Sequence, residues 1–456
     1  MSTELEEALT AAGVGALIQK QIDPLMLEYQ RRYSPLVRTV PAQQWGATDY
    51  NFNRRTNRAP GGFVTDGGAR PVGNSVYEQF KFTIRNMQSV GAVTGYAQTV
   101  TAALIGDLRR QEIESCVQGL LWDIETAMLW GNDPATNLGP YPQFSGLANL
   151  ITQFASVGMS PQNAVDENGV SFTTNQLDRL IDLVESNAAA PVGSNYMFVM
   201  SPTANSKVSQ GETAFQRFTN QVEVAAGLNV MSYRDIPIIK SSFLSSRGGA
   251  MSPIAATPGG TGGALAAGAR SYIVTAVVSR YGELSPSAEV TATTTTATST
   301  VALAFTPPQG PEGAFPLSYK VYEGAAGAET LLGVVDAVVG LQGDGVTPIF
   351  TTSIVDTGAA LVPQNGNIIP ASTPAAYVGG SAERPRSAGG EDVYLIPKDR
   401  DVLLRPYTRD VRPVDIYPTT SSPDSLPFAL LTDTCLALRA PKYAGRLRNV
   451  TATLAA

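Results

Sequence analysis

The stretch from Thr101 to Trp130 most constrains what this chain can fold into, because it has the pattern of one long amphipathic helix. Its apolar residues recur at steps of three to five and so fall on one helix face. These residues are Leu104, Leu108, Ile113, Val117, Leu120, Ile124 and Met128. Thr101 is a suitable N-cap, and Gly131 followed by Pro134 marks the other end. Such a helix is about 45 Å long, which is more than a small domain needs.

The segment before this helix, residues 48–100, predicts a long β-hairpin. From Val76 to Ile84, apolar and polar residues alternate, as in a strand with two different faces. Pro-Gly-Gly at 60–62 and Asp-Gly-Gly at 66–68 are turn signals at its tip. The basic residues around that tip are Arg54, Arg55, Arg58 and Arg70. One interpretation is a solvated basic loop. Because the hairpin is too long to fold back on one core, we favour an arm that reaches an acidic surface of a neighbouring subunit.

The segments on either side complete a mixed α and β body. Residues 1–47 form an N-terminal arm with little core of its own, with a helix expected over 14–32 and extended chain near Pro35 and Pro41. After the long helix, Thr173 and Gln176 suit a capping box, and residues 196–200 suit a buried strand. Ser201-Pro202 then suits the start of a helix. The isoleucines around Pro237 predict a strand near a sheet edge.

A change of composition near residue 257 predicts an inserted domain. Residues 257–263, Thr-Pro-Gly-Gly-Thr-Gly-Gly, have the composition of a linker. Short Val/Thr/Tyr-rich strands then follow at regular spacing, which predicts a small β-sandwich over 262–361. A second Gly/Ser/Pro-rich stretch, 363–390, returns the chain to the host body. In the remaining sequence, Arg439, Arg446 and Arg448 have no aromatic platform interleaved with them for a nucleic-acid site, so we expect them to be surface charges.

The composition removes several classes of function. The chain has 456 residues, which suggests two or three domains, and its net charge of −7 is not that of a general nucleic-acid binder. Histidine is absent, and the two cysteines, Cys116 and Cys435, cannot form a zinc site alone. No phosphate-binding lysine loop, nucleophile elbow, membrane-length apolar run or signal-peptide pattern occurs. We therefore expect no catalytic residues, no metal and no cofactor, and two buried free thiols in a reducing compartment.

The order of these segments resembles the major capsid proteins of tailed bacteriophages, which have the Hong Kong 97-like fold. That order is arm, long hairpin, long helix, α/β body, insertion and return strands. Residues 129–132 (Leu-Trp-Gly-Asn) and 144–147 (Phe-Ser-Gly-Leu) look like the turn after the family's spine helix. Residues 195–202 and 235–239 look like its P-domain strand and its A-domain strand. The resemblance covers nearly the whole chain outside the insertion and implies an α+β fold.

The resemblance also implies a division into domains. The segments are an N-terminal arm at 1–47, an E-loop at 48–100, a spine helix at 101–131, a P-domain at 132–210, a first A-domain part at 211–256, the inserted sandwich at 262–361, a second A-domain part at 375–425, and C-terminal P-domain strands at 426–456. The insertion resembles a fibronectin type III or immunoglobulin-like module, which family knowledge places outside the shell. Some relatives crosslink a lysine to an asparagine. Lys81 is the single lysine of the E-loop, but it lies on the strand instead of the tip, so we expect no crosslink.

The function implied is structural. Copies of the chain would assemble into hexamers and pentamers of an icosahedral head that encloses double-stranded DNA without sequence specificity. A scaffolding protein, a portal protein at one vertex and decoration proteins would be partners, and no membrane would be involved. Assembly would take place in the host bacterial cytoplasm, and the final location would be the virion capsid. Two alternatives stay open: a surface adhesin that displays the sandwich, and an encapsulin-type protein compartment.

Overall fold

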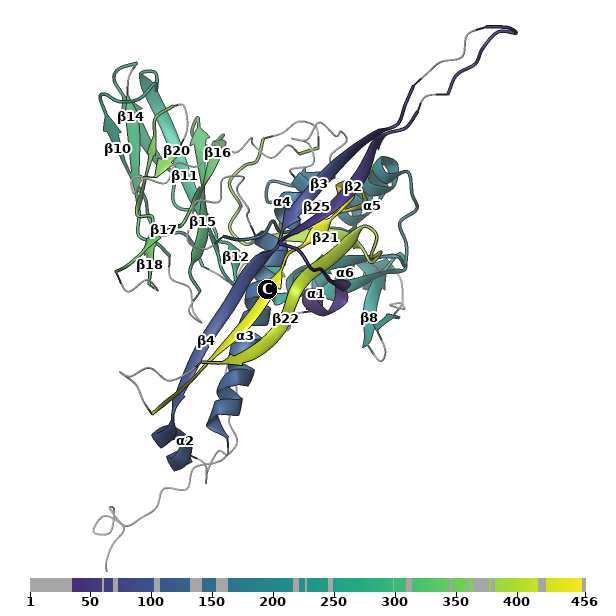
Figure 1. Ribbon diagram of the computed structural model, residues 1–456. Helices are drawn as coiled ribbons and strands as arrows, with labels where there is room; N and C mark the ends of the chain where they lie inside the picture. The colour runs from purple at the N-terminus through teal and green to yellow at the C-terminus, as the bar shows by residue number, and fades with distance from the viewer. Residues whose placement is uncertain are drawn as a thin grey trace, which may run out of the picture. The chain divides into compact units, whose positions relative to one another are not determined.

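The computed structural model has a mixed α+β fold that is rich in strands (Figure 1). It describes residues 35–59, 61–68, 73–101, 107–131, 142–152, 163–215, 221–225, 228–244, 249–297, 299–308, 314–343, 347–358, 361–363, 377–378, 382–416 and 424–452. The described chain forms two compact units. The smaller contains residues 89–117 and 413–430, and the larger contains residues 35–88, 118–412 and 431–452. The α+β class predicted from the sequence is therefore confirmed.

The predicted hairpin is present as β2 (Asp49–Asn57) and β3 (Val76–Thr83), which pair antiparallel and lie side by side in Figure 1. Aromatic residues on one face hold the two strands together. The Phe52 ring stacks on those of Phe80 and Phe82, with centroids 5.8 and 5.7 Å apart. After Ile84, the chain continues as β4 (Arg85–Thr94). The alternation seen in the sequence thus corresponds to a real two-faced ribbon.

The long helix is shorter than predicted. Thr101 is not its N-cap but the last residue of a separate helix, α2 (Gly95–Thr101), and α3 runs from Leu108 to Trp130. Asp107 caps α3, because its Oδ1 accepts a hydrogen bond from the Arg110 backbone N–H at 3.2 Å. Asp is a favoured N-cap residue, so α3 begins here and the periodic pattern before this point is not part of it. Leu104 lies outside the described residues.

The C-terminal end of α3 is as predicted. The Gly131 N–H donates to the Ala127 carbonyl at 2.9 Å, and the Gly146 N–H donates to the Gly131 carbonyl at 2.8 Å. A Cβ on Gly131 would overlap the carbonyl oxygen of Phe144. Only glycine allows these two backbone segments to approach so closely. Leu120, Ile124 and Met128 are buried, so the second half of the helix buries the predicted apolar face.

A seven-stranded mixed sheet forms the centre of the larger unit. Its strand order is β5 (Ala164–Asp166), β25 (Gly445–Thr451), β21 (Gly390–Pro397), β6 (Tyr196–Met200), β9 (Ile236–Lys240), β8 (Leu228–Tyr233) and β7 (Gln221–Ala225). Residues of α5 (Thr174–Ala188) and α6 (Pro202–Phe215) pack with those of this sheet in one hydrophobic core. Gln176 closes the predicted capping box by accepting a hydrogen bond from the Thr173 N–H at 2.9 Å.

This sheet differs from the sequence analysis in two respects. β9 is an internal strand between β6 and β8, not an edge strand, although it contains Pro237. Pro237 is paired with Ser232 of β8, whereas the register with β6 starts only at Ile238, so the proline takes no part in the β6 pairing. The predicted boundary at 210/211 separates β6 from β9, which are directly paired. Strand pairing cannot be read from sequence order, and it joins segments that were assigned to different domains. The domain names themselves remain predictions.

A second sheet has the order β1 (Ala42–Gln44), β22 (Leu403–Asp415), β23 (Ser425–Thr434) and β4, with β24 (Ala437–Leu438) paired to β22. Short helices α1 (Pro35–Thr39), α4 (Leu147–Thr152), η2 (Ser242–Leu244) and η4 (Pro441–Tyr443) complete the body. Pro35 begins α1 instead of lying in extended chain, which suits proline at a first helical position. The helix expected over 14–32 lies outside the described residues. Both cysteines are free thiols, but Cys116 is only partly buried.

The region 255–363 forms two facing sheets around one core. One sheet has the order β10 (Ala255–Gly259), β14 (Thr300–Ala304), β19 (Ser353–Asp356) and β20 (Leu361–Pro363). The other has the order β12 (Gly282–Glu283), β11 (Gly268–Val278), β15 (Pro316–Gly324) and β16 (Thr330–Asp336), with β13 (Val290–Thr294) paired to β11. A two-stranded pair of β17 (Val338–Leu341) and β18 (Pro348–Phe350) adjoins them in sequence. The predicted strands are present, but the linker prediction is wrong at its start, since residues 257–259 pair with β14.

A buried carboxyl group anchors α1. Glu125, on α3, is fully buried, and its Oε2 accepts hydrogen bonds from the backbone N–H groups of Leu36 and Val37 at 3.1 and 3.2 Å. Its Oε1 accepts one from Ser241 at 3.1 Å. Burial raises the pKa of Glu125 from 4.5 to about 8, although these three hydrogen bonds oppose the rise.

We expect the Glu125→Gln variant to lose part of the pH dependence of folding. Because the folded state holds this proton at a higher pH than the unfolded chain, the free energy of unfolding should fall between pH 4.5 and about 8 in the parent. The slope from one proton is at most about 1.4 kcal/mol per pH unit. Urea denaturation across this range should show a shallower slope in Glu125→Gln and an unchanged one in the exposed control Glu114→Gln. Equal slopes in parent and Glu125→Gln would contradict the assignment.

Candidate assembly hairpin and buried charge cluster

Two of the predicted arginines, Arg54 and Arg55, do not share one face of the hairpin. Arg54 and Arg55 are successive residues of β2, opposite Glu78 and Tyr77, and so point to opposite faces of the hairpin. The Arg54 guanidinium lies 4.1 Å from the centre of the Phe80 ring, and the Arg55 guanidinium lies 5.2 Å from that of Tyr77. Burial lowers the pKa of Arg54, while the Glu78 charge opposes this. These two arginines therefore stabilise the hairpin itself.

The other predicted residues are more open. Arg58 is exposed just beyond β2, and Arg70 lies outside the described residues. Lys81 is exposed on β3, opposite Asn51 of the same hairpin. It is on the strand, as the sequence indicated, and nothing about a crosslink follows from this position.

The hairpin tip exposes apolar residues that the sequence analysis did not single out. The Phe63 side chain is fully exposed, and Val64 is 46% exposed. Val76 and Tyr77, where β3 begins, are exposed as well. A two-stranded hairpin is marginally stable in water unless another layer covers it. The signal that was available is the Phe-Val pair between two glycine-rich turns, because turn sequences are usually polar.

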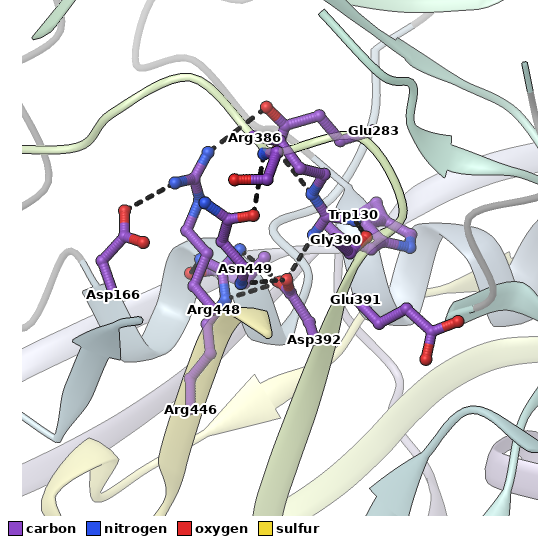
Figure 2. Close-up of polar contacts among 12 residues, drawn as sticks. Trp130, Asp166, Glu283, Arg386, Gly390, Glu391, Asp392, Arg446, Arg448 and Asn449 are labelled. Carbon is purple, nitrogen blue, oxygen red and sulfur yellow. Dashed lines mark hydrogen bonds and ion pairs between the residues drawn. The ribbon is translucent and has the colours of Figure 1, made fainter. Parts of the chain in front are cut away.

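A cluster of buried charges lies where the insertion meets the seven-stranded sheet (Figure 2). At its centre is Arg448 of β25, whose side chain is completely buried. Its guanidinium lies 2.6 Å from the Asp166 carboxylate, 3.1 Å from that of Glu383 and 3.4 Å from that of Glu283. These carboxylates come from β5, from the return segment and from β12 of the sandwich. Arg448 therefore joins three parts of the chain that are far apart in sequence.

The cluster continues on both sides of Arg448. Arg446, two residues earlier on β25, lies 2.6 Å from the Asp392 carboxylate, which also pairs with Arg386. Lys320 of β15 lies 3.0 Å from Glu283 and 2.8 Å from Glu383. The expectation that Arg446 and Arg448 are surface charges is wrong. No sequence periodicity reveals this burial, because the compensating carboxylates come from other segments.

The charges of this cluster are balanced, with four cations and four carboxylates. Burial alone would raise the pKa of Glu383, but Arg448 and Lys320 together lower it to about 2. The pKa of Asp392 is likewise lowered by Arg386 and Arg446, against the effect of burial. In both cases the neighbouring cations outweigh the effect of burial. The cluster therefore joins β25 to the segments that supply its carboxylates.

Removing Arg448 should be strongly destabilising. The Arg448→Met variant keeps the volume of the side chain but leaves three carboxylates facing one another without their shared cation. Breaking a buried ion pair on one side costs about 3–5 kcal/mol. The matched control is Arg110→Met, since Arg110 pairs with Glu114 on the exposed helix surface, where such a pair contributes about 0.3–0.5 kcal/mol. Urea denaturation of both variants measures the decrease in the free energy of unfolding. Similar decreases in Arg448→Met and Arg110→Met would contradict the role assigned to the cluster.

The same cluster should make the fold sensitive to acid. A carboxyl whose pKa is lowered on folding stabilises the protein above its unfolded pKa, and this stabilisation disappears as pH falls through its folded pKa. For Glu383 that window runs from pH 4.5 to about 2. Glu383→Gln should therefore be less stable than the parent at pH 7, and the difference should shrink as pH approaches 2. A stability difference that is constant from pH 7 to pH 3 would contradict this.

Other kinds of site are not found in the described part of the chain. Its His, Cys, Asp and Glu side chains form no group of three or more that could hold a metal ion. None of the described helices is both long and apolar enough to cross a membrane.

Comparison with known proteins gives one family match, which covers part of the chain. Residues 84–250, from the end of the hairpin through α3 to the segment after β9, match the model of the SU10 major capsid protein family. No curated protein matches the chain. The sequence prediction of a phage major capsid protein is thus confirmed, and the place of such a protein is the virion capsid.

Several solved structures are similar over nearly their whole length. The SrpI encapsulin of Synechococcus elongatus PCC 7942 is 10% identical, covers 98% of each chain and has a TM-score of 0.45. The capsid of the native GTA particle is 10% identical, covers 98% of this chain and 100% of its own, and has a TM-score of 0.46. Mycobacterium phage Ogopogo gives 9% identity, coverage of 97% and 99%, and a TM-score of 0.48. At these scores the similarities add nothing to the family match.

Proposed function

We propose that this phage major capsid protein builds an icosahedral head from hexamers and pentamers of itself, with the β2–β3 hairpin of each copy lying on a neighbouring copy. The observation that carries the proposal is the open hairpin. Among the described residues, its two strands are paired with each other and with no further strand. Its tip exposes Phe63, and β3 is mostly exposed. Such a ribbon gains stability when a second surface covers it.

Charge supports a second copy of the chain as that surface. Residues 48–100 contain six Lys and Arg residues and three Asp and Glu residues, so the segment carries +3. Since the whole chain carries −7, the remaining residues carry −10. A basic arm and an acidic body attract each other between copies. The anchor would be apolar, because Arg54 and Arg55 already contact rings within the hairpin, whereas Phe63 is free to enter a pocket.

The remaining parts of the proposal follow from the role of a capsid protein. The head would enclose double-stranded DNA without sequence specificity, since an acidic shell can hold DNA by confinement. A scaffolding protein and a portal protein would take part in assembly in the host bacterial cytoplasm, and decoration proteins are a further class of partner. The sandwich, as a fibronectin-like or immunoglobulin-like module, would face outward. The chain would have no enzymatic activity.

Substitutions at the hairpin tip test the assembly role. Phe63→Ser removes the exposed ring without touching the paired strands, so the subunit should fold normally and shell formation should fall by roughly tenfold or more, as for a lost interface anchor of about 2 kcal/mol. Val64→Ser at the tip and Val170→Ser on the body form a matched pair, since both valines are about half exposed. Only Val64→Ser should reduce assembly.

The readout is the yield of closed particles by electron microscopy after expression with the neighbouring genes. Circular dichroism and thermal melting verify that each variant subunit is folded. Normal particle yields from Phe63→Ser would contradict the assignment of the tip as an intersubunit anchor. Loss of particles from Val170→Ser would show that removing any exposed apolar side chain reduces the particle yield, which would contradict a specific role of the tip.

A further inference from the structure

We infer that the turn between β11 and β12 locks the inserted sandwich to the capsid body in one orientation, so that the sandwich is a fixed projection and not a domain on flexible tethers. The juxtaposition that carries this is the turn, residues 279–283, seated between the C-terminal half of α3 and the end of β25. Domains joined by linkers alone are expected to move relative to each other. A further attachment at a point of the chain outside both linkers restricts that movement.

The backbone of the turn is shaped for close approach. Arg280 has φ 66° and Gly282 has φ 72°, so two of its residues are in the left-handed region. A Cβ on Gly282 would lie 2.5 Å from the Trp130 ring, at the end of α3. Tyr281 and Glu283 are buried on either side of this glycine. The turn therefore packs directly against the helix, with space for no side chain at its centre.

Arg280 attaches the turn to the middle of the same helix. Its guanidinium pairs with the Asp123 carboxylate at 3.0 Å, and its backbone N–H donates a hydrogen bond to Thr126 Oγ1 at 3.1 Å. Asp123 and Thr126 are three residues apart on α3, and so lie on one helix face. The backbone and the side chain of one turn residue are thus held by adjacent positions of the helix.

Glu283 attaches the turn to the central sheet. On the sandwich side, its carboxylate accepts hydrogen bonds from Thr275 Oγ1 at 3.0 Å and Tyr322 Oη at 3.1 Å. On the body side it pairs with Arg448 at 3.4 Å, and Figure 2 shows the two side chains facing each other. Because the carboxylate is buried, displacing the sandwich would separate Glu283 from Arg448 and leave each buried charge with fewer partners. That penalty opposes rotation of the sandwich.

The return segment adds to this joint. Glu383 contacts Arg448 of the body at 3.1 Å and Lys320 of the sandwich at 2.8 Å, and its carbonyl accepts a hydrogen bond from the Leu331 N–H at 2.8 Å. It therefore bridges the two parts with both its side chain and its backbone. These contacts add to the attachment that the turn provides.

The test measures the width of a distance distribution between two spin labels in one chain. One label is placed at exposed Ala326 of the sandwich and the other at exposed Arg400 of the body, each through a cysteine, with Cys116 replaced by serine. Labelled chains are diluted into unlabelled ones so that each measured pair lies within one molecule. We expect one narrow distribution in the parent, and roughly twofold broadening in the double variant Arg280→Ala/Asp123→Ala and in Glu283→Gln.

The control is Arg270→Ala/Glu323→Ala, which removes an ion pair within the sandwich that does not touch the body. It should leave the distribution narrow. Thermal melting of each variant shows whether the sandwich itself is folded, and Gly282→Ala gives a second way to loosen the turn if Glu283→Gln does not fold. A broad distribution in the parent, or unchanged width in every folded joint variant, would overturn the inference. This result does not depend on shell assembly.

Discussion

The Arg448 guanidinium is completely buried, and most of the larger unit depends on how it is neutralised. A buried guanidinium is tolerated only when carboxylates surround it. The three that do so belong to β5, to the turn of the sandwich and to the segment that returns from it. The sheet, the insertion and the return segment must therefore be in place together before this charge is compensated. These buried contacts tie the β-sandwich at 255–363 to the central sheet.

The β2–β3 hairpin differs from this charge cluster, because part of it is not covered by other segments of the chain. Its rings and two of its arginines satisfy one another within the ribbon, yet much of the ribbon and the apolar tip are left uncovered. A subunit whose buried charges are neutralised within the chain, but whose hairpin is left uncovered, is suited to associate through that hairpin. This difference between the body and the hairpin suits a capsid protein, because its subunit has to fold by itself and also bind its neighbours.

Features encoded by local sequence were predicted well. The hairpin, the end of α3 at Gly131, the capping box of α5 and strand β6 all follow from periodicity, turn residues and caps within a few positions of one another. The start of α3 was misplaced because the periodic pattern of apolar residues begins before Asp107, the residue that caps this helix. The strand at residues 257–259 was missed because pairing with β14 overrides a glycine-rich composition.

The features that were not predicted depend on contacts between distant segments. Nothing near Arg446 or Arg448 in the sequence reveals that Asp392 or Glu283 will lie beside them, so they were assigned to the surface. The placement of β9 inside the sheet has the same cause. For the candidate site, the position of the hairpin was predicted, but the proposed anchor, Phe63, was not. The sequence prediction rested on the charges of the arginines. In the structure, Arg54 and Arg55 contact rings of their own hairpin, and Phe63 is exposed.

The most direct test of the account is electron cryomicroscopy of particles formed when the chain is expressed with its neighbouring genes. The account predicts closed icosahedral shells in which the β2–β3 hairpin of each copy lies on another copy, with the Phe63 ring covered. Soluble monomers or small oligomers in the presence of the scaffolding protein would contradict it. Shells in which the hairpin tip projects into solvent would contradict the assembly role of the hairpin.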